Sequence, residues 1–408
     1  MLLAGCAKED GSTDSNAVSS SEDETEEETL EPIIPTMVSM EDIREAAENF
    51  SGSYKNLDFT DTVFSIPEND SVYELTFTMP TEAEEFETME DMILANMDEL
   101  AGSSDVGNLR WMLWDDDRTV TLASELSTEE KAGQACLTYN DGTYTALLYC
   151  NTYMLEMADS KLWADLAGYE EFDENYKFTY RPMFIEDQTL VATYNLPEDS
   201  IDGISYTLMD GEMSVEDAVS YVEEEIKNYY YVGKSCIDFY VSEVDVYQLS
   251  SGEYYYYFYL SGSYDGIKMS DFVGFTFEED QDIDFAVSYT YHEAAMIYTD
   301  RISYIWGQHG YSDVETEEET EFVSLDDACN LVSRLVSSNA SLSISEVSLV
   351  YDTHDFKGGD SRGDDFVSYI EGRLVYEFIV SNPQILGYSA VRFCVDAVTG
   401  ETYTMYSE

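Results

Sequence analysis

Apolar residues along this chain follow two periods, one typical of helices and one typical of strands. A helical period begins after Ser39 and recurs from Glu82 to Leu100, behind Thr81. A hairpin is expected over 135–150, because Asn140-Asp141-Gly142 is a turn sequence between two apolar runs. Runs of β-branched and aromatic residues predict further strands at 59–66, 72–79, 108–124, 177–184 and 189–195. These elements predict one α+β domain over residues 37–210.

The second half of the chain repeats a pattern. Ser214-Val215-Glu216-Asp217-Ala218 recurs as Ser324-Leu325-Asp326-Asp327-Ala328, and each copy opens an amphipathic helix. Both serines are good N-caps, and the acidic residue three positions later completes a capping-box pattern. Each helix is followed by a strand with Ser-Glu-Val, an aromatic strand and a last strand. We therefore predict an α+β protein with antiparallel sheets each packed by helices. Its tandem helix-plus-sheet repeat covers 211–311 and 324–408, with an acidic linker at 312–323.

The second predicted unit ends in Val395-Asp396-Ala397-Val398-Thr399-Gly400-Glu401. Val-Asp-Ala, a variable residue and then Thr-Gly-Glu is the usual close of PepSY-type repeats in secreted Gram-positive proteins, which this unit resembles. The first unit departs from that pattern, because its Phe275-Thr276-Phe277-Glu278-Glu279 has no Thr-Gly turn. The resemblance implies peptide binding, or the inhibition or chaperoning of secreted proteases.

The first residues carry a location signal. Leu3-Ala4-Gly5-Cys6 resembles the lipobox of bacterial lipoproteins, which implies a diacylglyceryl group on Cys6. A signal peptide needs an apolar region of roughly 7–15 residues, so we expect residues 1–6 to be the end of a longer signal. Residues 7–36 are rich in Ser, Asp, Glu and Thr, and we expect a disordered acidic tether with a reach of about 30 Å. The expected location is the outer face of the cell membrane; the alternative is a cytoplasmic protein with a chance match.

The charge balance excludes one class of partner. The chain has 18 Lys and Arg against 86 Asp and Glu, a net charge of −68, which repels nucleic acid and anionic lipid alike. No run of about 20 apolar residues is present, so lipid on Cys6 must supply any membrane attachment. We expect a monomer with a peptide, protein or cell-wall partner and no cofactor.

Motifs for catalysis are absent from the sequence. His292-Glu293-Ala294-Ala295-Met296 has Met296 where a zinc-protease helix needs its second histidine. The six cysteines have no metal-like spacing, and Cys236, Cys329 and Cys394 stand among apolar neighbours, as buried thiols do. Cys136 and Cys150 flank the expected hairpin, and their pairing is left open. We expect a non-enzymatic binding protein; the alternatives are a carboxylate-based hydrolase and a structural spacer.

One aromatic run is a candidate binding surface. Tyr254-Tyr255-Tyr256-Tyr257-Phe258-Tyr259 places aromatic side chains on both faces of its strand, because successive residues face opposite sides. One face can belong to the core. The other face either packs beneath the helix of the neighbouring unit or forms an exposed platform for a peptide or sugar. The candidate ligand-stacking residues are Tyr254, Tyr255, Tyr256 and Tyr257.

Overall fold

The computed structural model divides the chain into two compact units. Unit 1 comprises 1–71, 319–348 and 375–408, and unit 2 comprises 72–318 and 349–374. The structure describes residues 33–52, 54, 56–69, 72–78, 85–102, 104–113, 120–131, 134, 136–149, 154–169, 180–196, 199–231, 236–270, 274–277, 284–286, 292–308, 313–336, 341–353 and 369–407. Within these residues, no helix is long and apolar enough to cross a membrane.

Unit 2 is built on an eleven-stranded sheet. Its hydrogen-bonded order is β10-β13-β14-β18-β19-β9-β8-β7-β5-β6, with β15 paired to β14. The strands along this order are β10 (Gln188–Asn195), β13 (Asp238–Leu249), β14 (Tyr254–Tyr264), β18 (His292–Met296), β19 (Tyr304–Gln308), β9 (Met154–Ala158), β8 (Thr145–Tyr149), β7 (Cys136–Asn140), β5 (Leu109–Met112), β6 (Val120–Leu122) and β15 (Ile267–Lys268). All their registers are antiparallel.

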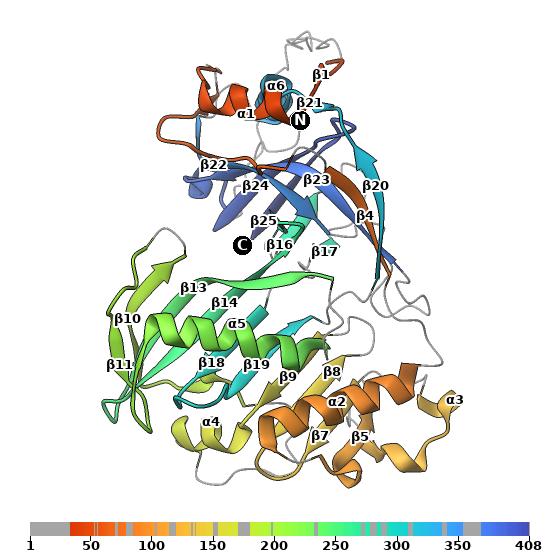
Figure 1. The fold of residues 1–408 in the computed structure, drawn as a ribbon, viewed down its shortest axis with the longest axis vertical. Coiled ribbons are helices and arrows are strands. Elements are labelled where there is room, and N and C mark those ends of the chain that lie inside the picture. Colours follow the sequence, from red (N-terminus) through yellow and green to blue (C-terminus); the bar gives the residue numbers. More distant parts are fainter. Residues whose placement is uncertain are drawn as a thin grey trace, which may run out of the picture. The chain divides into compact units, whose positions relative to one another are not determined.

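Helices cover both faces of this sheet. In Figure 1, α2 (Glu85–Ala101) and α5 (Val215–Tyr231) lie side by side across it. Ser214 caps α5, because its Oγ accepts from the Asp217 N–H at 3.0 Å and donates to the Asp217 carboxylate at 2.7 Å. The opposite face receives Trp163 of α4 (Ser160–Leu166), whose ring lies 5.5 Å from that of Tyr255 in β14.

Shorter elements complete unit 2. They are β4 (Val72–Thr78), α3 (Thr128–Lys131), β11 (Ser205–Thr207), β12 (Glu212–Ser214), β16 (Gly274–Phe277) and β17 (Asp284–Ala286), with 3-10 turns η1 (Val106–Asn108), η2 (Ala123–Glu125) and η3 (Pro182–Phe184). β11 pairs with β12 and β16 pairs with β17, both antiparallel.

Unit 1 packs two capped helices, α1 (Met40–Glu48) and α6 (Leu325–Leu335), with its own strands. Ser39 with Asp42 and Ser324 with Asp327 form equivalent caps, and the strands preceding the two helices pair with each other. The order β25-β24-β23-β22-β2 forms the sheet, with β3 also against β22. These strands are β1 (Met37–Val38), β21 (Phe322–Val323), β2 (Leu57–Asp58), β3 (Val63–Ser65), β22 (Leu342–Asp352), β23 (Tyr369–Val380), β24 (Ala390–Asp396) and β25 (Thr402–Ser407), with η4 (Pro383–Ile385) before β24. Of β22 and β23, residues 342–348 and 375–380 belong to unit 1.

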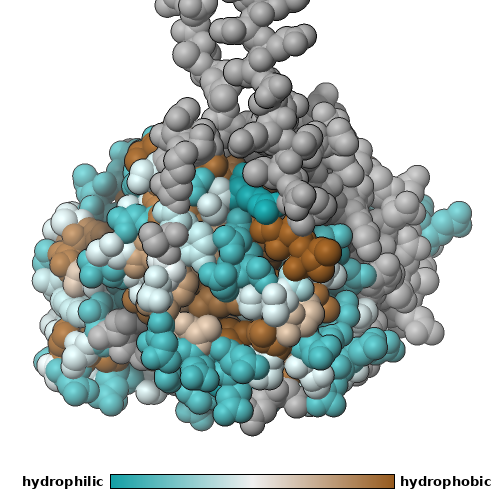
Figure 2. Space-filling view, turned by 90° about the horizontal axis from the view of Figure 1, so that it is seen from above, coloured by the Kyte–Doolittle hydropathy of each residue, from teal (hydrophilic) through white to brown (hydrophobic). Residues whose placement is uncertain are grey.

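The observed fold is mixed α/β, with several antiparallel sheets and few helices. β2 and β3 are exceptions to the antiparallel rule, because both pair with β22 in parallel. The face shown in Figure 2 has hydrophilic residues along its margin and smaller hydrophobic areas between them, as expected for so acidic a chain.

Several local expectations need correction. The expected strand at 177–184 is described only from residue 180, and 182–184 form a 3-10 turn because Pro182 fixes a turn-compatible φ at its start. The expected linker at 312–323 contains β20 (Asp313–Glu319), which pairs with β4 while residues 315–318 keep their side chains exposed. The expected 37–210 domain is also divided, because 37–71 belongs to unit 1 and 72–210 to unit 2.

Candidate functional site

The tyrosine run of β14 lies in the interior of unit 2. Tyr255, Tyr256 and Tyr257 are 1%, 0% and 7% exposed, and Tyr254 is half-buried. Of the two alternatives, the exposed stacking platform is therefore wrong for these three rings, because both faces of β14 are covered. The cover comes from the same unit rather than from a helix of the neighbouring unit. The covering segments are α4 on one side and the chain before α5 on the other.

On the α5 side, tyrosines pack against one another. The Tyr206 ring on β11 lies 5.1 Å from that of Tyr254 and 6.0 Å from that of Tyr256. The Tyr256 hydroxyl donates to the Met213 carbonyl at 2.7 Å, just before the cap of α5. Burial raises the pKa of Tyr206 to about 12, helped by its hydrogen bond with the Tyr194 hydroxyl. These phenols therefore stay protonated at neutral pH and act as structural donors.

On the α4 side, tyrosines surround two carboxylates. Asp245 of β13 is 6% exposed and accepts from Thr193 Oγ1 at 2.5 Å, from Tyr247 at 3.3 Å and from Tyr259 at 3.5 Å. The Tyr257 hydroxyl donates to Glu293 of β18. We call these six residues, Thr193, Asp245, Tyr247, Tyr257, Tyr259 and Glu293, the acid–tyrosine cluster.

Burial determines the protonation of the tyrosines in this cluster. It raises the pKa of Tyr247, Tyr257 and Tyr259, and the carboxylates of Asp245 and Glu293 raise it further. A phenol with a raised pKa is a hydrogen-bond donor and a poor base at neutral pH. The arrangement therefore supports positioning and packing of side chains, with Asp245 already accepting from three hydroxyl groups.

A buried ion pair lies further along the same sheet. Glu156 of β9 is 0% exposed, and Arg181 meets it through two bonds, Nε to Oε1 at 2.5 Å and Nη2 to Oε2 at 2.7 Å. Burial lowers the pKa of Arg181, but the Glu156 carboxylate outweighs it and the net direction is upward. A two-point pair of this kind compensates the cost of burying the Glu156 carboxylate, while Arg181 is half-buried, and it indicates a structural role.

His292 and the four cysteines that the structure describes do not form a catalytic arrangement with one another. His292 and Met296 lie on the extended strand β18, so these two positions do not share one helix face, as the two histidine ligands of a zinc protease do. His292 is 0% exposed, with its ring 4.4 Å from that of Phe239. Cys136, Cys329 and Cys394 are buried and Cys236 is half-buried, and burial raises the pKa of Cys329 to about 12. No group of three potential metal ligands occurs among the described residues.

Several predicted features fall outside the described residues. These are the lipidation candidate Cys6, the acidic tether up to residue 32, and Cys150. The lipid anchor therefore stays a prediction, and the pairing of Cys136 with Cys150 stays open.

One of the two edges of the large sheet, the strand β10, carries exposed apolar side chains. Residues 189–191, 193 and 195 are exposed, and the side chains of Leu190 and Val191 are 50% and 43% exposed. The sequence predicted this strand but did not indicate that it lies at the sheet edge. A usable signal was present: its eight residues carry no charge, although Glu186-Asp187 and Glu198-Asp199 flank it.

No protein-family model and no curated protein sequence matches the chain. Among solved structures, an uncharacterised protein from Eubacterium rectale ATCC 33656 is similar at 15% sequence identity and a TM-score of 0.42. The match covers 85% of this chain and 90% of that one. A likeness at this level carries no functional argument.

Proposed function

We propose that this protein is a lipid-anchored, extracytoplasmic binding protein that captures an extended peptide or protein partner without catalysis. The main support is a contrast within unit 2. Its buried tyrosines and carboxylates bond to one another, whereas the outer strand β10 presents Leu190 and Val191 to solvent. A sheet edge of this kind binds partners through backbone hydrogen bonds and needs no catalytic group.

The proposed membrane attachment rests on Leu3-Ala4-Gly5-Cys6 and the acidic segment that follows. The test is to express the gene with its native upstream region in its bacterial host and to feed cells an alkyne-tagged palmitate. We expect label on the wild-type protein in the membrane fraction, because two acyl chains anchor stably. Cys6→Ser is the control and should lose both the label and the membrane association. Unlabelled wild-type protein in the cytosol would contradict the anchor.

We also propose that both units contain the same helix-plus-sheet repeat. After α5, the strands β13, β14, β18 and β19 lie each beside the next, with β15, β16 and β17 between β14 and β18 along the chain. After α6, the strands β22, β23, β24 and β25 also lie each beside the next, and they follow one another directly in sequence. The Tyr256 hydroxyl donates to the residue before Ser214, and the Tyr376 hydroxyl donates to Val323 before Ser324, at 2.7 and 2.6 Å.

A second correspondence supports the repeat. One residue further along each strand, Tyr257 bonds to Glu293 on β18 and Glu377 bonds to Arg392 on β24, the latter at 2.7 Å. In both registers the pair is diagonal across neighbouring strands, since Tyr257 lies opposite Ala295 and Glu377 opposite Cys394. The proposed repeat extends the PepSY-type resemblance of 324–408 to the α5 unit, and it fits a peptide-binding role.

One experiment distinguishes a binding protein from the two alternative functions, a structural spacer and a hydrolase. The Cys6→Ser chain, immobilised and exposed to envelope proteins of the host, should retain a saturable partner. The control is an unrelated acidic protein of similar net charge, which reports retention by charge alone. A structural spacer would retain nothing above that control, and a hydrolase would cleave envelope material on prolonged incubation.

A further inference from the structure

The strand β10 is an edge with one side paired. It pairs with β13 from Gln188↔Leu249 to Asn195↔Glu243, with a register shift between Leu190 and Ala192. Within the part of the chain that the structure describes, no strand pairs with its other side. Proteins usually protect such edges with charges or proline, and β10 has neither. The bulge at Val191 limits the regular part of the edge to the residues after it.

The outward backbone groups of this edge can be assigned from two hydrogen bonds. The Leu196 N–H donates to the Ser242 carbonyl at 2.8 Å, toward β13, whereas the Asn195 N–H donates to the Asp199 carboxylate at 2.8 Å. Because backbone groups alternate in direction along a strand, Thr193 directs its N–H and C=O away from β13. An incoming strand would therefore pair with Thr193.

Side chains hold this edge in place. Thr193 Oγ1 donates to Asp245, the Tyr194 hydroxyl bonds to that of Tyr206 at 2.9 Å, and Gln188 accepts from the Tyr255 hydroxyl at 2.5 Å. These bonds tie β10 to buried residues on both faces of the sheet. A partner would meet a rigid strand, which lowers the entropy cost of binding.

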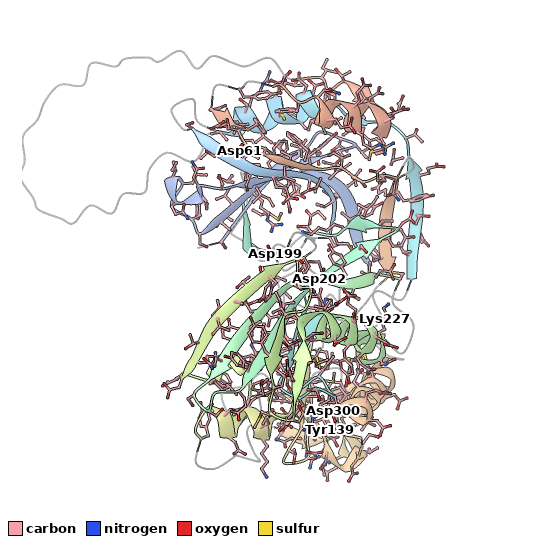
Figure 3. The ribbon with its side chains drawn as sticks, turned by 60° about the vertical axis from the view of Figure 1, so that its left-hand side comes forward. Asp61, Tyr139, Asp199, Asp202, Lys227 and Asp300 are labelled. Atoms are coloured by element: carbon pink, nitrogen blue, oxygen red, sulfur yellow. The ribbon has the colours of Figure 1, made fainter. Side chains whose placement is uncertain are left out.

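The surroundings of β10 are strongly acidic. Residues 182–226 contain twelve Asp and Glu and no Lys or Arg. Glu186, Asp187, Asp199 and Asp202 are exposed around the two ends of the strand, and Figure 3 shows the last two beyond its C-terminal end. A neutral strand between acidic ends favours a partner with the complementary distribution of charge.

We propose that β10 accepts an extended peptide segment with an uncharged, β-branched centre and lysine or arginine at both ends, which adds to the sheet as a strand. This deepens the proposed binding function and depends on it. The backbone of Thr193 supplies the hydrogen bonds, the exposed side chains of Leu190 and Val191 supply apolar contact, and the acidic ends attract the basic residues. A second copy of this chain is the less suitable occupant, because each copy carries a charge of −68.

The test uses the full Cys6→Ser chain and a fluorescent peptide, Lys-Lys-Val-Thr-Val-Thr-Lys-Lys. Fluorescence anisotropy should show saturable binding that weakens as NaCl rises to about 0.5 M. A peptide with glutamates in place of the lysines should not bind. Hydrogen exchange of the complex should show new protection at Thr193, because its outward N–H becomes bonded.

Two substitutions at one position isolate the backbone bond. Thr193→Ala removes the hydroxyl and keeps the N–H, whereas Thr193→Pro removes both, and edge strands tolerate proline where the N–H faces solvent. We expect Thr193→Pro to bind the peptide about tenfold more weakly than Thr193→Ala. If Thr193→Pro does not fold, Leu190→Lys against Leu190→Gln replaces it, and the added positive charge should weaken binding of the basic peptide.

Some results would overturn the proposal. These are no saturable binding at about 1 mM peptide, equal binding of the basic and acidic peptides, or equal affinities of the matched variants. Dimerisation abolished by Thr193→Pro would assign the edge to a second copy instead. If an envelope partner is still retained by Thr193→Pro as by Thr193→Ala, the binding function stands and only its assignment to β10 fails.

Discussion

At the scale of single residues, tyrosine hydroxyls determine how the large sheet is packed. Alternation along β14 sends Tyr256 toward the cap of α5 and Tyr255 toward α4. The Tyr256 hydroxyl donates to the Met213 carbonyl, and the Tyr255 hydroxyl donates to Gln188 of β10. A tyrosine can be buried in this way because its ring supplies apolar area and its hydroxyl is satisfied. The sequence could show the alternation but not which face would be covered.

Gly307 provides a residue-scale prediction. It lies opposite His292, and a Cβ at this position would be 2.1 Å from His292 Cδ2. Gly307→Ala should therefore lower the free energy of unfolding by about 1–3 kcal/mol, since a buried ring must move. The measurement is urea denaturation. Gly211→Ala is the control, because its Cβ would meet Thr299 Cγ2 at an ordinary 3.6 Å. Equal midpoints for the two variants would show that His292 moves without cost.

At the scale of elements, local signals predicted well and long-range signals did not. The helix starts at Ser214 and Ser324 are predicted from a capping serine and an acidic residue three positions later, both close in sequence. The helix after Ser39 is predicted from its apolar period. The sequence predicts a linker at β20, because its glutamates are typical of a solvated linker and not of a strand. The strand is recognised only from its pairing with β4. α4 was not predicted, because seven residues give too short a helical period.

The proposed repeat gives an element-scale prediction. Tyr256→Phe and Tyr376→Phe remove matching hydroxyls that bond to the chain just before α5 and α6. Each should lower the free energy of unfolding by about 1 kcal/mol, because a carbonyl loses its donor. Tyr254→Phe is the control, since Tyr254 is half-buried and its hydroxyl accepts from the Gln248 side chain, which solvent can replace. Denaturation curves test all three. A loss for Tyr256→Phe no greater than that for Tyr254→Phe would contradict the proposed role.

At the scale of the whole molecule, the chain combines a very acidic surface with buried phenols. The net charge of −68 repels nucleic acid, which is also negatively charged, and disfavours it as a partner. Burial meanwhile raises the pKa of tyrosines in both units, among them Tyr206, Tyr255 and Tyr376.

Alkaline unfolding is the corresponding prediction. An unfolded tyrosine titrates near pH 10, and burial raises the folded-state pKa above that value. Stability from these groups is therefore complete below about pH 10 and is lost as pH rises toward and beyond 12. Urea midpoints should be constant from neutral pH to about pH 9 and then fall steeply, with phenolate absorbance rising in the same transition. Exposed tyrosines such as Tyr169 add phenolate absorbance that does not depend on unfolding. An unfolding transition with no step in phenolate absorbance would therefore show that the buried tyrosines are already open to solvent.

The sequence alone determined the features that depend on neighbours a few residues apart. These are the capped helices after Ser214 and Ser324, the hairpin at Asn140-Asp141-Gly142, the acidity and the strand expected at 189–195. Tertiary structure decided which strand became an edge, which tyrosines were covered, and that residues 37–71 join the end of the chain in unit 1. The physical reason is that caps and periodicity are local interactions, whereas strand order and burial arise from contacts between residues tens to hundreds of positions apart.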